Sequence, residues 1–132
     1  MSDAIHVLQE AAVSALEAHP VLGTELSGVY DGPPPRAAFP YVSIGDNFTS
    51  DWSTKTAKGR EIRLALTVWD EGEVASRLSS LMGHVEGAIA ALPRDLSGWR
   101  IASLVFLRSF VVRDAAGPWA GLVEFRVRML SV

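Results

Sequence analysis

Cysteine is absent from the 132-residue sequence. Its absence excludes disulfide bonds, thiolate metal sites and cysteine catalysis, and it leaves the redox compartment unmarked. The N-terminus has no basic stretch followed by an apolar run, and no segment approaches the roughly 20 apolar residues that a membrane span needs. We therefore expect a soluble protein that is made in a cytoplasm and has no membrane partner.

Basic residues are in the minority, because 12 lysines and arginines face 15 aspartates and glutamates, for a net charge of −3. This balance argues against a general nucleic-acid binder. The charge is also unevenly distributed, with a net of −6 over residues 1–93 and +3 over residues 94–132. The C-terminal part is therefore predicted to be basic, and the rest of the protein acidic.

The motifs of common catalytic and cofactor sites are missing as well. The sequence has no G-x-S-x-G turn, no H-E-x-x-H or H-x-x-x-H pair and no phosphate-binding glycine loop. The three histidines, His6, His19 and His84, fall in predicted helices, and His6 with Glu10 has the spacing of a surface helix pair. We therefore predict no catalytic residues, no metal site, no cofactor and no enzymatic activity.

Two segments have the apolar periodicity of amphipathic helices. The first is expected to begin at a Ser2 or Asp3 cap and to end at His19-Pro20. The second is expected to be capped by Asp70 with Glu73 as its reciprocal partner, and to end at Pro93. The apolar positions are Ile5, Leu8, Ala12, Ala15 and Leu16 in the first helix, and Val74, Leu78, Leu81, Val85, Ile89 and Leu92 in the second.

Strand patterns occupy most of the remaining chain. Short strands are expected at residues 29–30 and 41–45, and the prolines at 33–35 between them form a stiff spacer or edge. Residues 60–69 alternate strictly between apolar and other side chains, and two long strands are expected at about 99–112 and 118–130. The last strand places Val123, Phe125, Val127 and Met129 on one face, and Glu124, Arg126 and Arg128 on the other.

These elements follow the order α-β-β-β-α-β-β. Short connections favour antiparallel pairing, and two amphipathic helices suffice to cover one face of a sheet. We therefore expect residues 1–132 to form a single α+β domain of two layers, in which two helices pack on one face of an antiparallel sheet of four to five strands. The strand from Trp99 is apolar on both sides, so its second face is expected to meet a loop of this chain or, more economically, a second subunit.

The segment from Asn47 to Gly59 is longer than a usual hairpin connection and carries a tryptophan, Trp52, among small polar residues. Two interpretations stay open: Trp52 anchors an interface with another protein, or it folds back over its own domain beside Trp69. The predicted interface residues are Asp51, Trp52, Ser53, Thr54 and Lys55 of this loop, Pro34 and Pro35 of the proline segment, and Arg108, Arg126 and Arg128 of the last two strands.

The arginines of the final two strands could face a polyanion. They equally fit a sheet edge that is protected against unwanted strand pairing, and they lack the interleaved exposed aromatic residues of a single-strand binder. Direct DNA contact is therefore the less favoured interpretation. The alternative hypothesis is that these arginines pair with acidic neighbours.

Four runs of the sequence, VYDGPPP, FPYVSIGD, DWSTKTAKGREIRLALTVWDEGE and WAGLVEFRVR, resemble a family of phage tail-completion proteins. These are the tail terminator or tail-to-head joining proteins of long-tailed bacteriophages and gene transfer agents. The resemblance covers nearly the whole chain. It is most specific from Asp51-Trp52-Ser53 through Gly59 and Glu61 to Val68-Trp69.

The resemblance implies an α+β subunit that assembles into a hexameric ring, caps the tail tube and offers a docking surface to the neck, stopper or head-completion protein. DNA would pass through the ring without sequence-specific binding. The implied location is the tail–neck junction of the virion, after assembly in the bacterial host cytoplasm. On the sequence alone a second function stays open, a small non-catalytic binding or accessory domain that forms a dimer.

Overall fold

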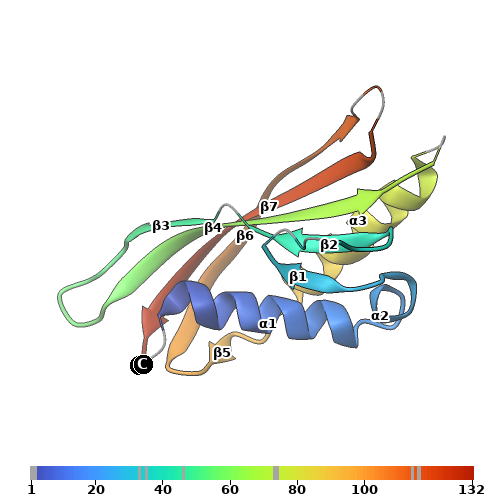
Figure 1. Ribbon diagram of the computed structural model, residues 1–132. Helices are drawn as coiled ribbons and strands as arrows, with labels where there is room; N and C mark the ends of the chain where they lie inside the picture. The colour runs from blue at the N-terminus through green and yellow to red at the C-terminus, as the bar shows by residue number, and fades with distance from the viewer. Residues whose placement is uncertain are drawn as a thin grey trace.

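The computed structural model describes residues 3–32, 34, 36–45, 47–72, 75–113, 115 and 117–132. It is an α+β structure in which helices line one face of a curled sheet (Figure 1). The elements are α1 (Ala4–Ala18), α2 (Leu22–Glu25), β1 (Val29–Asp31), β2 (Tyr41–Ile44), β3 (Phe48–Asp51), β4 (Gly59–Asp70), α3 (Ser76–Ala90), β5 (Asp95–Leu96), β6 (Trp99–Arg113) and β7 (Trp119–Ser131).

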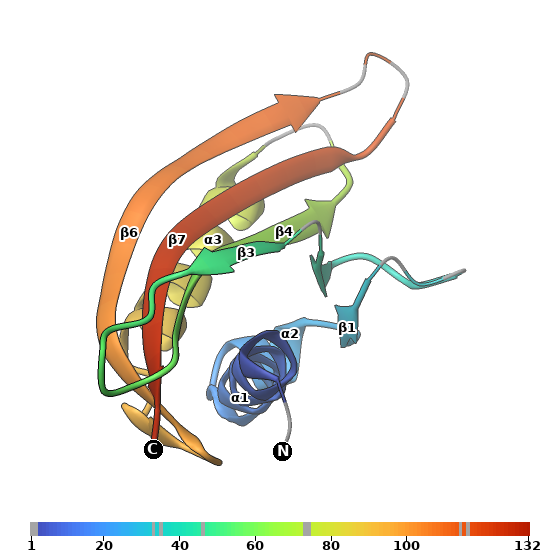
Figure 2. The same ribbon diagram turned by 90° about the vertical axis from the view of Figure 1, so that its left-hand side faces the viewer.

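The sheet has seven strands, more than the four to five that were predicted. Its order is β1-β2-β4-β7-β6-β5, and β3 pairs with the part of β4 that β2 leaves free. β1 and β2 run parallel, so the antiparallel prediction was wrong for that pair, whereas the other pairs are antiparallel. β3 and β5 escaped prediction because four and two residues are too short to show a period. The long strands curve around the helices as a half-barrel (Figure 2).

The predicted alternation of β4 and β7 is confirmed. All 12 residues of β4 pair with β7, and Leu64 lies opposite Phe125 on the face that meets the helices. The side chains buried on that face are Ile62, Leu64, Leu66 and Val68 of β4 and Val123, Phe125, Val127 and Met129 of β7. These two strands therefore supply the floor of the hydrophobic core.

The first helix begins and ends as predicted. Asp3 is its N-cap and accepts a hydrogen bond from the backbone N–H of His6 at 2.9 Å. After the helix ends, the Nδ1 of His19 accepts from the backbone N–H groups of Val21 and Leu22 at 3.1 and 3.2 Å, which turns the chain into α2. The helix buries Ala4, Val7, Leu8, Ala12 and Leu16 against the core.

The predicted start of the second long helix was wrong. Asp70 is the last residue of β4, and α3 begins only at Ser76, without a side-chain cap. The buried Asp70 carboxylate instead accepts hydrogen bonds from the backbone N–H of Glu71 at 2.8 Å and from Nε of Arg77 at 2.7 Å. It therefore ties the end of β4 to the first turn of α3.

The apolar stripe of α3 is confirmed where the structure describes it, while Glu73 and Val74 lie outside the described residues. Its members Leu78, Leu81, Val85 and Ile89 are buried. Leu92 is also buried, but it follows the helix, which ends at Ala90 and not at the predicted Pro93. The helix approaches the sheet closely at Gly121 of β7, where a Cβ atom would collide with the side chain of Met82. A larger residue at this position would require the side chain of Met82 to move.

Truncating the core floor should destabilise the protein strongly. Phe125→Ala is expected to lower the free energy of unfolding by about 3–5 kcal/mol, because it opens a cavity at a side chain that is almost fully buried. Urea denaturation measures this loss. The matched variant Phe48→Ala, at a side chain exposed to 62%, should stay within about 0.5 kcal/mol of the wild type, and equal losses would contradict the assigned core.

The Asp70–Arg77 contact should give stability a defined pH dependence. Arg77 holds the pKa of Asp70 below its usual value of 3.8. Its stabilisation is therefore fully present above about pH 4 and is lost as the pH falls through the lowered pKa of the folded state. Asp70→Asn should lower the free energy of unfolding by about 1–3 kcal/mol at pH 7 and should not change it below that pKa. In the same denaturation assay the exposed Asp95→Asn should cost little at either pH, and a cost for Asp70→Asn that does not depend on pH would contradict the ionic contact.

Candidate assembly surfaces

The outer half of β6 is an exposed apolar strand end. Among the described residues β5 pairs only with Trp99 and Arg100, so from Ile101 onward β7 is the one strand beside β6. The large apolar side chains beyond that point are exposed to between 38% and 51%, and they are Val105, Phe106, Phe110, Val111 and Val112. Apolar side chains are therefore exposed along this strand, and their burial by a loop of this chain or by a second subunit stays a prediction. We call these five side chains the β6 patch.

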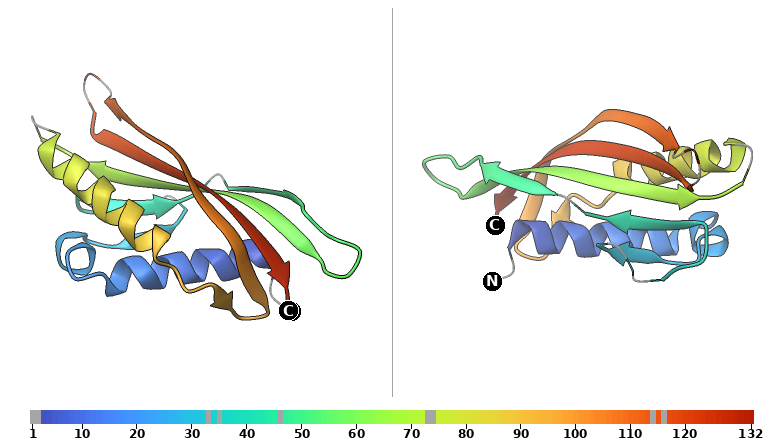
Figure 3. Two further views of the ribbon diagram at one scale, coloured as in Figure 1. Left: turned by 180° about the vertical axis from the view of Figure 1, so that it is seen from behind. Right: turned by 45° about the horizontal axis from the view of Figure 1, so that its top comes forward.

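A hollow of about 330 Å³ continues this surface towards α3. Phe110 and Val111 form its β6 side, and Figure 3 shows α3 running beside β6 when the molecule is seen from behind. The α3 side is open because Gly83 carries no side chain there, and Glu86 places one carboxylate at the wall. The remaining lining residues are Ser79, Met82 and Ser109. An apolar group from another molecule can therefore contact both elements.

The segment from Asn47 to Gly59 is not one long loop, as was predicted, because its first part forms a strand. Phe48 to Asp51 form β3 and pair with residues 60–63 of β4, which leaves only residues 52–58 as the connection. The hairpin projects from one end of the sheet (Figure 1), and we call it the β3–β4 arm.

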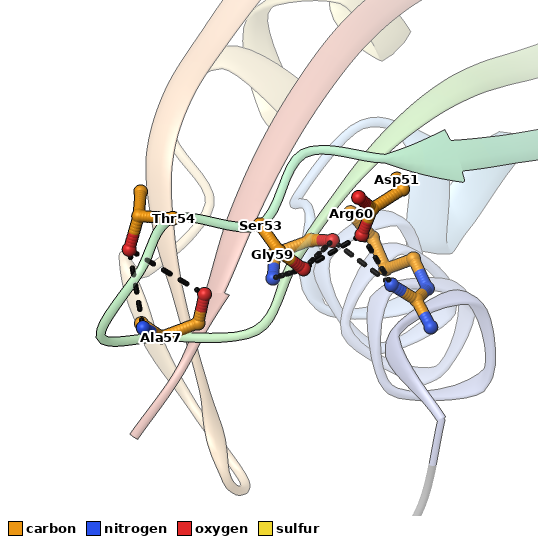
Figure 4. A network of polar contacts seen from close by, with 6 residues as sticks. All are labelled: Asp51, Ser53, Thr54, Ala57, Gly59 and Arg60. Atoms are coloured by element: carbon orange, nitrogen blue, oxygen red, sulfur yellow. Dashed lines mark hydrogen bonds and ion pairs between the residues drawn. The ribbon is translucent and has the colours of Figure 1, made fainter.

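Polar contacts hold the tip of the arm closed (Figure 4). The Ser53 hydroxyl donates to the Asp51 carboxylate at 2.6 Å and accepts from the backbone N–H of Gly59 at 3.0 Å. The backbone N–H of Thr54 donates to the carbonyl of Ala57 at 2.9 Å. Asp51 also pairs with Arg60 at 3.2 Å. The arm is therefore a preformed feature of the subunit.

Trp52 lies over its own sheet and is half-buried. The guanidinium of Arg128 lies 5.4 Å from the centre of its ring, and the Nε of Arg128 donates to Glu61 at 2.8 Å. The predicted proximity to Trp69 was wrong, because Trp69 lies at the other end of β4 and stacks on Tyr41. A role for Trp52 at an interface stays a prediction.

The structure brings only part of the predicted interface set together. Asp51, Trp52, Ser53, Thr54 and Lys55 share the β3–β4 arm, and Arg128 joins them through Trp52. Arg108 lies farther along the sheet, opposite Glu124, and pairs with it at 3.0 Å. Pro34 lies between β1 and β2, whereas Pro35 is outside the described residues. The predicted set therefore covers several surfaces.

Most arginines of the last two strands are already engaged within the chain. Glu124 raises the pKa of Arg108 further above its usual range, Arg128 pairs with Glu61, and Arg113 stacks over Trp119 at 4.4 Å. Arg126 differs, because its Nε is buried without a hydrogen-bond acceptor in the described part of the chain. A continuous basic surface for a polyanion is therefore not available on these strands.

The described residues contain no group of three or more histidine, aspartate and glutamate side chains that could hold a metal ion. His6 forms the predicted helix pair with Glu10 at 3.3 Å, and the rings of His19 and His84 lie 5.2 Å apart. None of the helices in the described ranges is long and apolar enough to cross a membrane.

Removing the Trp52 side chain should leave the fold intact. It is not one of the fully buried core side chains, so Trp52→Ala is expected to keep a cooperative thermal transition and to impair assembly. Calorimetry together with a mass measurement separates the two effects. Global unfolding of the variant would show that Trp52 belongs to the core of its own domain.

Comparison with known proteins identifies the family of this chain. The family model described as tail completion protein gp17 matches residues 10–130. The tail completion protein gp17 of Bacillus phage SPP1 is 26% identical over 124 residues, which are 93% of this chain and 92% of the relative.

Two solved structures resemble the fold. A chain in the virion of a native gene transfer agent particle matches with a TM-score of 0.73 and 26% identity, over 99% of this chain and 100% of the other. The structure of bacteriophage SPP1 gp17 matches with a TM-score of 0.64 and 24% identity, over 96% and 89%. This chain therefore belongs to the tail completion protein gp17 family of structural tail proteins.

Proposed function

We propose that this protein forms a ring, hexameric in its final state, that caps a tail tube and joins it to the head or neck of a phage-type particle. The observation that carries the proposal is the β6 patch with its neighbouring hollow. These five apolar side chains lie along one edge of the sheet and point to both of its faces. Exposed apolar groups of this kind mark contact sites for other molecules, and a ring subunit needs such contacts at its sides.

The shape of the subunit supports this role. The β3–β4 arm lies at one end of the sheet, and the last paired residues of β6 and the first of β7 lie at the opposite end in the views of Figures 1 and 3. In a ring each contact joins one surface of a subunit to a different surface of the next. Two dissimilar projecting ends suit that arrangement, and they also leave surfaces for two further partners, the tail tube protein and a neck or stopper protein.

The names of the relatives support the location. One relative is named as a tail completion protein, and one similar chain was solved within a gene transfer agent virion. We therefore place this protein in the virion at the junction of tail and head, after assembly in the host cytoplasm.

DNA passes through the ring without sequence-specific contact in this proposal, and no enzymatic step is required. The ion pairs of Arg108 and Arg128 support the absence of specific DNA contacts, because arginines that are paired within the chain bind phosphates weakly.

The mass of the purified protein tests the ring directly. We expect a hexamer in native mass spectrometry, either alone or once tail tube subunits are added. A stable dimer under both conditions would favour the alternative function, a small binding or accessory domain.

A single charge in the β6 patch should block ring formation. Val112→Glu is expected to give a folded monomer, because the side chain is half exposed in the subunit but would be buried at a subunit contact. Val132→Glu introduces the same change at a side chain exposed to 69% and outside the β6 patch, and should assemble normally. Equal assembly of both variants would exclude the β6 patch from the contact.

A further inference from the structure

Two arginines face each other without a carboxylate between them. Arg63 of β4 lies directly opposite Arg126 of β7 in the strand register. In the described part of the chain neither forms an ion pair, and the Nε of Arg126 is buried without an acceptor. Like charges in opposite positions destabilise a sheet, and a buried donor without an acceptor adds a further cost.

The neighbouring arginines on the same face of the sheet differ from this pair, because each has a glutamate opposite it. Arg128 lies opposite Glu61 and pairs with it at 2.8 Å, while Arg108 lies opposite Glu124 and pairs with it at 3.0 Å. The arginines on either side of the Arg63–Arg126 pair each have a glutamate opposite them. Arg63 and Arg126 are therefore the one place on this part of the described sheet where an arginine has no carboxylate opposite it. A carboxylate supplied from outside the subunit could pair with the exposed Arg63 and so offset the positive charge of both arginines.

The opposite side of the molecule carries the reverse imbalance. Residues 1–31 include no lysine or arginine, and their carboxylates are Asp3, Glu10, Glu17, Glu25 and Asp31. Two of them, Glu10 and Asp31, line a hollow of about 460 Å³ between α1 and β1. Its other lining residues are Gln9, Val13 and Ser14. The Glu10 side chain is 70% exposed and has only His6 as an ion-pair partner among the described residues. We call this site the acidic hollow.

The two sites cannot meet within one subunit. Arg63 and Arg126 alternate along their strands with the buried residues Ile62 and Val127, so they point away from the helix layer. The acidic hollow lies on the helix side, where α1 packs under the curve of the sheet (Figure 2). The two sites can meet only if they belong to different copies of the subunit, and in a ring such a contact repeats from one copy to the next.

We propose that the Arg63–Arg126 pair of one copy docks against the acidic hollow of the next, with Glu10 and Asp31 as the carboxylates that it meets. Arginine suits this contact because its planar guanidinium donates two parallel hydrogen bonds to a carboxylate. The inference rests on the proposed ring. It adds a charged contact between subunits to the apolar contact proposed at the β6 patch.

The variant Arg63→Glu separates this contact from a merely structural role. It places a carboxylate opposite Arg126 within the subunit, so the thermal midpoint of the variant should not fall. Its assembly should weaken, with a dissociation constant raised on the order of tenfold or more in sedimentation measurements. Arg100→Glu is the matched control, because Arg100 belongs to an exposed pair with Asp95 and its reversal should leave assembly unchanged.

A second substitution in the same chain provides a rescue. Each copy presents both sites, so Arg63→Glu with Glu10→Arg restores opposite charges at every contact and should recover most of the lost affinity. Assembly of the wild type should also weaken as salt is raised from about 50 to about 500 mM, since ions screen exposed charges. A purely apolar contact would not weaken in this way.

The outcomes distinguish this contact from the ring itself. If Arg63→Glu assembles as tightly as the wild type, or if Glu10→Arg restores nothing, the contact is wrong and the ring stands. If the wild type stays monomeric alone and with tail tube subunits, the proposed ring fails and the contact fails with it. A lowered thermal midpoint for Arg63→Glu would contradict the assigned like-charge conflict, and the salt dependence of the wild type then decides whether the contact exists.

Discussion

The pairing of β4 with β7 is the constraint on which the rest of the structure depends. Every residue of β4 is matched by one of β7, so a shift by a single position would turn the whole apolar set of either strand towards water. The α3 helix can pack only on the face thus defined, and Gly121 lets it come close. The opposite face of the sheet receives the charged residues.

The strands on the two sides of the β4–β7 pair differ in length, and the proposed assembly surfaces lie where the shorter strands end. On one side β2 and then β3 divide the length of β4, and the separate β3 strand produces the arm with Trp52. On the other side β6 pairs along β7 but itself meets β5 only at its first two residues. An apolar strand end and a preformed arm therefore lie at opposite ends of one subunit, and charge mismatches lie on its two sides. Exposed apolar side chains and unmatched charges lower the stability of a monomer, whereas in a ring they can form contacts between subunits.

Long periodic segments could be predicted from the sequence, and short elements could not. The alternation of residues 60–69 and the stripe from Leu78 to Leu92 identified β4 and α3, because each spans several periods. The four residues of β3 are too few to be told from a loop. The sequence around Asp70 predicts a helix cap, because it does not reveal that the carboxylate is buried beside Arg77. The two-sided apolar strand pointed to the β6 patch, but the Arg63–Arg126 conflict depends on the strand register, which no local pattern reveals.

Amide hydrogen exchange tests the central claim, that the outer half of β6 is covered when the protein assembles. In the unassembled protein the amides of residues 105–113 that point away from β7 should exchange quickly, since this edge has no second strand in the described chain, and those of β4 should exchange slowly. On assembly we predict that residues 105–113 slow on the order of tenfold or more while β4 stays unchanged. Equal exchange at residues 105–113 in the free and assembled protein would contradict the account.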